Sequence, residues 1–314
     1  MNSQTDMSAT SGQRKRAFLI LLIMPLFFSS NMVFGRAAIQ LGAEPFTLAF
    51  LRWSLAAAIL APFVWGDIKS ASIDWKTLWK PLTLMGFLGM WVCGALVYLA
   101  LKYTTATNGT LIYTSSPVII ILIERVLRGR VISALEALGI LLAIVGVVSI
   151  VVRGSLDILL SLSFNAGDLL FVVASVSWAV YSFLLRGEEF QALPTMPLFA
   201  LIAAFGAAIL APFAAAETVV TQSAPTGALL WANIAGIILF SSLIAFSSYN
   251  HGVKVLGSSL AGIFLYLLPI YGVALAVILL GEEVFAYHVW GSMLVLGGVV
   301  LATFPRDRKG HPKH

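Results

Sequence analysis

A segment near the middle of the chain occurs a second time near its C-terminal end. Residues 104–151 match residues 256–303 when the sequence is shifted by 152 positions. In this register the two copies share a proline, three glycines and a Val-Val pair: Pro117 with Pro269, Gly129 with Gly281, Gly139 with Gly291, Gly146 with Gly298, and residues 147–148 with 299–300. One such coincidence would mean little, but the whole set in one register indicates a duplicated structural unit.

The composition is that of a membrane protein. Hydrophobic residues make up 60% of the 314 and charged residues 11%, and the mean hydropathy is +0.96, whereas about a quarter of the residues in a soluble domain are charged. The net charge of +5 does not indicate a nucleic-acid partner, because the basic residues lie in loops beside apolar runs. The single cysteine, Cys93, excludes an intramolecular disulfide.

Ten apolar runs are long enough to cross a lipid bilayer, for which a helix needs about 20 residues. The connections between them are too short to hold a soluble domain. The sequence therefore predicts an all-α integral membrane protein. The expected spans are residues 17–40, 46–65, 80–101, 106–124, 132–152, 167–186, 195–214, 229–250, 258–280 and 284–304.

The duplication extends over the whole chain, since AAAILAPF at 56–63 returns as GAAILAPF at 206–213. Each half then holds five spans, and an odd number inverts the second half in the membrane. Inverted repeats of this kind are typical of alternating-access carriers. The expected parts are an N-terminal tail at 1–16, a first repeat at 17–154, a second, inverted repeat at 155–304, and a basic tail at 305–314.

The distribution of basic residues predicts the orientation. With the N-terminus in the cytoplasm, 15 of the 19 Lys and Arg residues fall on the cytoplasmic side, and the exceptions are Arg36, Arg52, Lys102 and Arg153. This is the bias of the positive-inside rule. We expect both termini to be cytoplasmic.

Motifs for enzymatic chemistry are missing from the sequence. The four histidines have no partner at metal-ligand spacing within a span. No glycine-rich phosphate loop and no G-x-S-x-G elbow occurs. We therefore expect no enzyme and no metal site.

Charged residues are scarce inside the expected spans. No carboxylate lies near the middle of a span, so a buried proton relay has no obvious place. The deepest charge is Arg52, about seven residues into the second span. We favour a side chain that reaches back to the outer interface, and the alternative is a gate or a carboxylate contact.

Polar and aromatic residues near mid-span concentrate in helices one, three, four, six, eight and nine. These six helices are expected to line a central polar cavity. Helices two, five, seven and ten would form a lipid-facing rim, so that Leu210 on the seventh helix would face lipid. The expected substrate-binding residues are Asn31, Trp91, Tyr98, Tyr113, Ser116, Trp178, Tyr181, Tyr249 and Tyr266.

These side chains could hold a small amphipathic molecule. Amide and hydroxyl groups donate and accept hydrogen bonds, and aromatic rings offer flat apolar faces. For each aromatic residue the alternative is packing or anchoring at the membrane interface, and for each serine it is a bond to the preceding helical turn.

Three prolines inside the spans are candidate hinges. Pro25, Pro117 and Pro269 lack the N–H that closes a helical turn, so each weakens its helix. The alternative is a static kink.

Small residues form a stripe on the fifth helix (Gly139, Ala143, Gly146) and on the tenth (Gly291, Gly298, Ala302). Such stripes allow helices to approach closely. They predict either packing of helix five on helix ten within one chain or a homodimer through the same two helices.

The pattern resembles the EamA-type transporters of the drug/metabolite transporter superfamily over about residues 17–304. The resemblance rests on residues 104–106, Pro117, Gly139 and Gly146 and on residues 258–259, Pro269, Gly291 and Gly298. The second half also carries the family's Gly281-Glu282, whereas the first half departs from it with Gly129-Arg130.

Overall similarity is greatest to amino-acid exporters of the bacterial inner membrane, in particular those for aromatic amino acids. The resemblance implies alternating-access efflux of small metabolites across the lipid bilayer with no cofactor. The alternatives are a multidrug or other metabolite carrier of the same fold and a passive channel.

Overall fold

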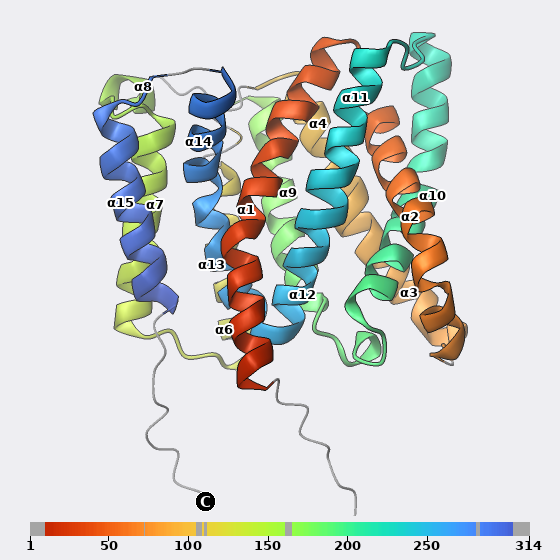
Figure 1. Cartoon of the computed structure of the whole chain (residues 1–314), viewed down its shortest axis with the longest axis horizontal. Helices are drawn as coiled ribbons and strands as arrows, with labels where there is room; N and C mark the ends of the chain where they lie inside the picture. The colour runs from red at the N-terminus through yellow and green to blue at the C-terminus, as the bar shows by residue number, and fades with distance from the viewer. Residues whose placement is uncertain are drawn as a thin grey trace, which may run out of the picture.

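The computed structural model describes residues 10–71, 73–104, 109, 112–160, 165–280 and 283–303, and these residues form a helical bundle without a strand (Figure 1). Nine helical stretches in this part of the chain are long and apolar enough to cross a membrane. The fourth expected span, 106–124, is described only in part, and its main helix begins at Ser116. The predicted all-α membrane fold is confirmed.

The described helices divide into two halves joined by the short helix α8 (Leu156–Leu160). The first half consists of α1 (Ser11–Gln40), α2 (Pro45–Ser70), α3 (Trp75–Gly86), η1 (Phe87–Leu96), α4 (Val97–Ala100), α6 (Ser116–Arg128) and α7 (Ala134–Val151). The second half consists of α9 (Ala166–Leu184), η2 (Glu188–Phe190), α10 (Thr195–Thr221), α11 (Ala228–Gly236), η3 (Ile237–Phe246), α12 (Ser247–Leu256), α13 (Ser258–Ile263), η4 (Phe264–Leu267), α14 (Leu268–Leu280) and α15 (Ala286–Thr303).

Equivalent helices of the two halves run in opposite directions. In Figure 1, α1 rises from the lower face of the bundle, whereas α9 descends from the upper face. The last helices, α7 and α15, are antiparallel in the same way, and α1 begins on the face where α15 ends. The two halves are therefore inverted repeats, as predicted.

A π-helical segment interrupts the third and the eighth transmembrane helix at equivalent places. These segments are η1 and η3, and they lie 150 positions apart, the same shift that relates 56–63 to 206–213. Wider π-helical turns are rare and frequently occur at functional sites. The duplication thus includes an irregularity of the backbone that residue patterns did not predict.

Helices α7 and α15 pack through their stripes of small residues. A Cβ atom on Gly139 would lie 2.5 Å from the Ala302 nitrogen, and one on Gly146 would lie 2.6 Å from the Gly291 oxygen. The two stripes therefore pack against each other within one chain. They are not free to form the homodimer interface that was the second alternative. A homodimer through these helices would have to use their outward faces.

Helices α2 and α10 also pair, and this pair does not form a simple rim. The Glu217 carboxylate on α10 accepts hydrogen bonds from the backbone nitrogens of Phe46 (3.2 Å) and Thr47 (2.7 Å), which caps the start of α2. Leu210 on α10 and Trp53 on α2 are buried. The prediction that Leu210 faces lipid is wrong, because each of these helices turns one face into the protein.

The paired prolines lie beside equivalent breaks in their helices. A turn at residues 114–115 precedes Pro117, and the 3-10 segment η4 precedes Pro269. Helix α1 instead continues past Pro25, and the Ser29 hydroxyl donates to the Pro25 carbonyl at 2.8 Å. A hinge role for these prolines stays a prediction.

Candidate substrate-binding cavity

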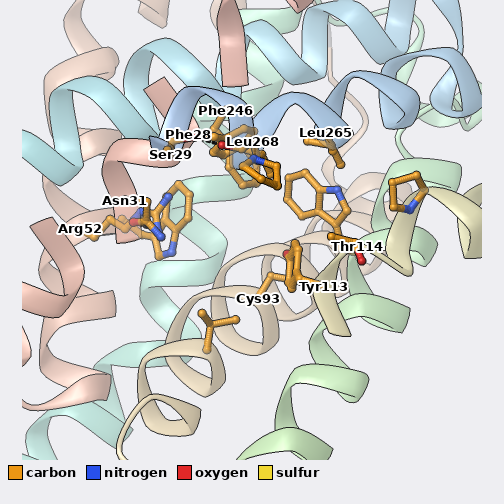
Figure 2. A pocket seen from close by; sticks show the side chains of 16 residues that line it. Phe28, Ser29, Asn31, Arg52, Cys93, Tyr113, Thr114, Phe246, Leu265 and Leu268 are labelled. Atoms are coloured by element: carbon orange, nitrogen blue, oxygen red, sulfur yellow. Dashed lines mark hydrogen bonds between the residues drawn. The ribbon is translucent and has the colours of Figure 1, made fainter. Parts of the chain in front are cut away.

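A cavity of about 230 Å³ lies inside the bundle (Figure 2). All six helices that were predicted to line it contribute residues, and α2 contributes as well. The prediction that the second helix takes no part is therefore wrong. The lining residues are Phe28, Ser29, Asn31, Arg52, Trp53, Cys93, Val97, Tyr113, Thr114, Pro117, Trp178, Phe246, Leu265, Leu268, Pro269 and Gly272.

One wall of the cavity is aromatic and is centred on Trp178. The Trp178 ring stacks on Tyr181 with centroids 5.5 Å apart, and it meets the edge of Phe246 at 5.3 Å and that of Phe28 at 5.9 Å. Its indole Nε1 has no hydrogen-bond partner among the described residues.

Two buried tyrosines hold this wall from behind. The Tyr181 hydroxyl donates to the Asn250 side-chain oxygen at 3.1 Å, and the hydroxyls of Tyr249 and Ser182 are 2.8 Å apart. The Tyr249 ring lies 4.8 Å from that of Trp178. Because both tyrosines are fully buried and anchored, they fix the orientation of the indole.

Another part of the cavity wall is polar and is built around Arg52, which is 4% exposed. Its Nε donates to the Ser242 hydroxyl at 2.7 Å, and its Nη2 donates to the Ser241 hydroxyl at 3.1 Å. Its Nη1 donates to the Asn31 side-chain oxygen at 3.2 Å and to the Tyr98 hydroxyl at 3.1 Å. Figure 2 shows Asn31 and Arg52 side by side in this part of the wall.

The expectation that Arg52 reaches out to the membrane interface is wrong. Hydroxyl and amide groups of α1, α4 and η3 surround the guanidinium inside the protein, and these fixed partners replace water. The sequence could not show this, because the partners come from three segments that are far apart in the chain.

Six of the nine predicted binding residues line the cavity or contact side chains that line it. Asn31, Tyr113 and Trp178 line the cavity. Tyr98 joins Arg52 to Asn31, with its hydroxyl 2.9 Å from the Asn31 oxygen. Tyr181 and Tyr249 support Trp178 from outside the cavity.

The other three predicted residues do not face the cavity. The Ser116 hydroxyl donates to the Tyr113 carbonyl at 2.8 Å, the local bond that was the alternative. Trp91 packs with Phe46 and Phe213 on the α2–α10 side. Tyr266 is fully buried, and its hydroxyl has no partner among the described residues.

Several lining residues were not predicted. Phe28, Trp53, Phe246 and Leu268 carry no signal in the sequence, since residues of these types occur in every span. Arg52 did carry a signal, because it is the deepest charge in the expected spans.

A second, larger hollow of about 840 Å³ opens on the side of the bundle where α1 begins. Its lining includes Arg16, Arg186, His251 and Lys254. On α1, α9 and the η3–α12 helix, the residues that line this hollow lie nearer the lower face of the bundle than the residues that line the cavity. The aromatic wall lies between the two sets. The wall therefore separates an inner cavity from a basic hollow.

Two inverted helical repeats around an internal cavity define a membrane transporter. The EamA-like transporter family matches residues 15–152 and again residues 165–304. The chain belongs to this family.

Curated relatives agree with this class. A Bacillus subtilis protein named uncharacterized transporter YyaM is 28% identical over 91% of this chain and 94% of its own length. An uncharacterized transporter of Archaeoglobus fulgidus is 28% identical over 92% of this chain and 97% of its own. A solved crystal structure with 21% identity has the same fold, with a TM-score of 0.74 over 92% of this chain and 96% of that one.

Proposed function

We propose that the protein exports amino acids, aromatic ones included, or similar small amphipathic metabolites from the cytoplasm. The observation that carries the proposal is the cavity, which is lined by the rings of Trp178, Phe28 and Tyr113 and by the polar groups of Asn31 and Ser29. Rings offer flat surfaces to an apolar side chain, and neutral amide and hydroxyl groups pair with the amine and carboxylate of a zwitterion.

The cavity volume favours such cargo over drugs. Pockets for drug-sized molecules measure roughly 300–1,000 Å³, and this cavity measures about 230 Å³. A multidrug carrier of the same fold would need a larger or more open cavity in this conformation.

Alternating access is favoured over a passive channel by the aromatic wall. Trp178, Phe246 and Phe28 lie between the cavity and the basic hollow on the other side. A channel needs one continuous polar path, whereas a carrier keeps one side of its site closed. Movement of the two repeats around this wall would open the cavity to the basic hollow.

The orientation follows from the charges. With both termini in the cytoplasm, the basic hollow faces the cytoplasm, in keeping with the positive-inside rule. We place the protein in the inner membrane of a bacterium, with the repeats at 17–154 and 155–304 as its two moving units.

The mode of coupling follows from the absence of acids at the site. No Asp or Glu is among the residues that line the cavity. We therefore propose a facilitator or exchanger and not an obligatory proton antiporter.

Efflux of labelled amino acids from proteoliposomes tests the proposal. We expect saturable efflux of phenylalanine and related amino acids, weakened by Trp178→Ala and by Asn31→Ala. Leu141→Ala is the control, because Leu141 lies on the outer face of α7 and is 57% exposed. Unchanged affinity and rate for every substrate in both cavity variants, at equal membrane expression, would refute the assignment of the site.

A further inference from the structure

The geometry points to Arg52 as the anchor for a carboxylate of the transported molecule. This inference rests on the proposed function and names the chemical group that the site selects. The cargo would be a compound with a free carboxylate at one end and an apolar or aromatic body at the other.

The first observation is that a charge is buried with neutral partners only. Arg52 is 4% exposed, and its four hydrogen bonds go to Asn31, Tyr98, Ser241 and Ser242. A buried charge is costly unless an opposite charge compensates it. Four dipoles offset part of that cost and leave the positive charge in place.

The second observation is that the protein supplies no counter-charge at this place. In the described part of the chain, no carboxylate oxygen lies within 4.0 Å of the Arg52 nitrogens. The buried carboxylates are engaged elsewhere, since Glu124 accepts from Ser258 and Ser259 and Glu136 pairs with Arg130 at 2.5 Å. A counter-anion that the described residues do not supply is therefore the missing partner.

The third observation is that Arg52 lines the cavity and has donor capacity left. A guanidinium carries five N–H donors, and the described hydrogen bonds use four of them. Arg52 lines the cavity, and the Trp53 ring packs 4.3 Å from its Cζ atom. A carboxylate entering the cavity would meet the remaining donor and could exchange with the neutral partners.

The position of Arg52 also orients the cargo. Arg52 and Asn31 lie side by side in the cavity wall (Figure 2), and the Trp178 ring lines the same cavity. A molecule held by its carboxylate at Arg52 would direct its apolar body toward the indole. An aromatic amino acid meets both requirements.

The test is a series of matched compounds that compete for transport by the full-length protein in proteoliposomes. The series is L-phenylalanine, L-phenylalanine amide, which lacks the carboxylate, and 3-phenylpropionate, which lacks the amine. A hydrogen-bonded partner of opposite charge makes a difference of roughly 10- to 150-fold in affinity. We expect the amide to lose this factor in the wild type and 3-phenylpropionate to compete better than the amide.

Substitution of Arg52 gives the second arm. In Arg52→Gln the difference between phenylalanine and its amide should disappear, and in Arg52→Lys it should persist in part, because lysine keeps the charge and loses the planar fork. Arg36→Gln is the matched control, since Arg36 is exposed near the end of α1 and does not line the cavity. This control should keep the wild-type preference.

The outcomes separate this inference from the proposed function. Equal transport of phenylalanine and its amide by the wild type would overturn the role of Arg52 and leave amino-acid transport intact. Binding of 3-phenylpropionate that depends on Arg52, without transport of any amino acid, would support the carboxylate anchor and overturn the proposed cargo. The wild-type comparison stands even where an Arg52 variant fails to fold, and absence of any competition would refute both.

Discussion

Helices α2 and α10 occupy equivalent places in the two repeats and differ most where they face the interior. The 150-residue shift that superposes 56–63 on 206–213 also superposes Arg52 on Ile202. Both side chains are buried, Arg52 with 4% exposed and Ile202 with 0%. At this pair of positions the first repeat therefore buries a charge and the second an apolar side chain.

The first helices of the repeats show the same division. The shift superposes Phe28 on Trp178, and these two rings meet at 5.9 Å across the centre of the molecule. It also superposes Asn31, which contacts Arg52, on Tyr181, which supports the aromatic wall. The backbone is thus nearly symmetric, while the side chains give the cavity one charged part and one aromatic part.

The largest expected effect comes from copying the charge into the second repeat. Ile202→Arg places a guanidinium in a fully buried site of α10, and an uncompensated buried charge costs about 3–5 kcal/mol. Ile202→Leu is the control, because a swap of similar volume costs less than about 1.5 kcal/mol. Thermal unfolding in detergent measures both, and equal stability of the two variants would show that α10 accepts a charge as readily as α2.

A smaller loss of stability is expected when a tyrosine hydroxyl is removed, either beside Arg52 or behind the aromatic wall. Tyr98→Phe removes a partner of the charged Arg52, which is worth about 1.5–3 kcal/mol. Tyr249→Phe removes a bond between two neutral hydroxyls, worth about 0.5–1.5 kcal/mol. Equal losses in thermal unfolding would contradict the view that only the part of the cavity around Arg52 is charged.

Substitutions of Trp178 and of Phe28, the two rings that meet at the centre, should differ in their effect on transport. Trp178→Leu removes the ring that Tyr181 and Tyr249 hold in place, and loss of one stacking contact should weaken apparent affinity for phenylalanine roughly 2- to 10-fold. Phe28→Leu should weaken it less, because Phe28 meets Tyr249 only edge-on at 6.3 Å, whereas Trp178 lies 4.8 Å from Tyr249 and stacks on Tyr181 at 5.5 Å. The concentration dependence of transport gives both values, and a larger effect of Phe28→Leu would reverse the assignment.

The smallest effect is expected on the outer face of α7. Leu141→Ala changes a side chain that is 57% exposed, and substitutions on such surfaces usually stay within about 0.5 kcal/mol. Stability and transport should both match the wild type. A marked loss in either would mean that this face meets another copy of the chain, which a change in oligomeric size would confirm.

The duplicated pattern predicted the fold well, because apolar length and a shared register of proline and glycine depend on local sequence alone. The six helices at the centre were predicted for the same reason, since polar residues in a membrane span avoid lipid. The rim was predicted less well. Helix α2 is apolar by composition, yet Arg52 and Trp53 on one of its faces reach the cavity.

The site was predicted only in part because its geometry joins distant segments. Asn31, Tyr113 and Trp178 could be chosen by residue type and depth. The position of Arg52 depends on Ser241 and Ser242, which are 189 and 190 positions away. Both serines lie on a π-helical segment that no local sequence pattern predicted. Trp91 and Tyr266 have the right type and depth but face other neighbours, because one residue turns a helical side chain by about 100°.

We expect one cavity between the two inverted repeats to carry the substrate. Counterflow tests it most directly: proteoliposomes loaded with unlabelled phenylalanine, at equal pH on both sides, take up labelled phenylalanine from outside. We expect labelled phenylalanine to accumulate transiently inside the proteoliposomes above its external concentration. The initial rate should saturate with substrate and should be reduced in Trp178→Ala. Uptake that rises linearly with concentration and never exceeds the external level would contradict it, because a channel and not a carrier behaves in that way.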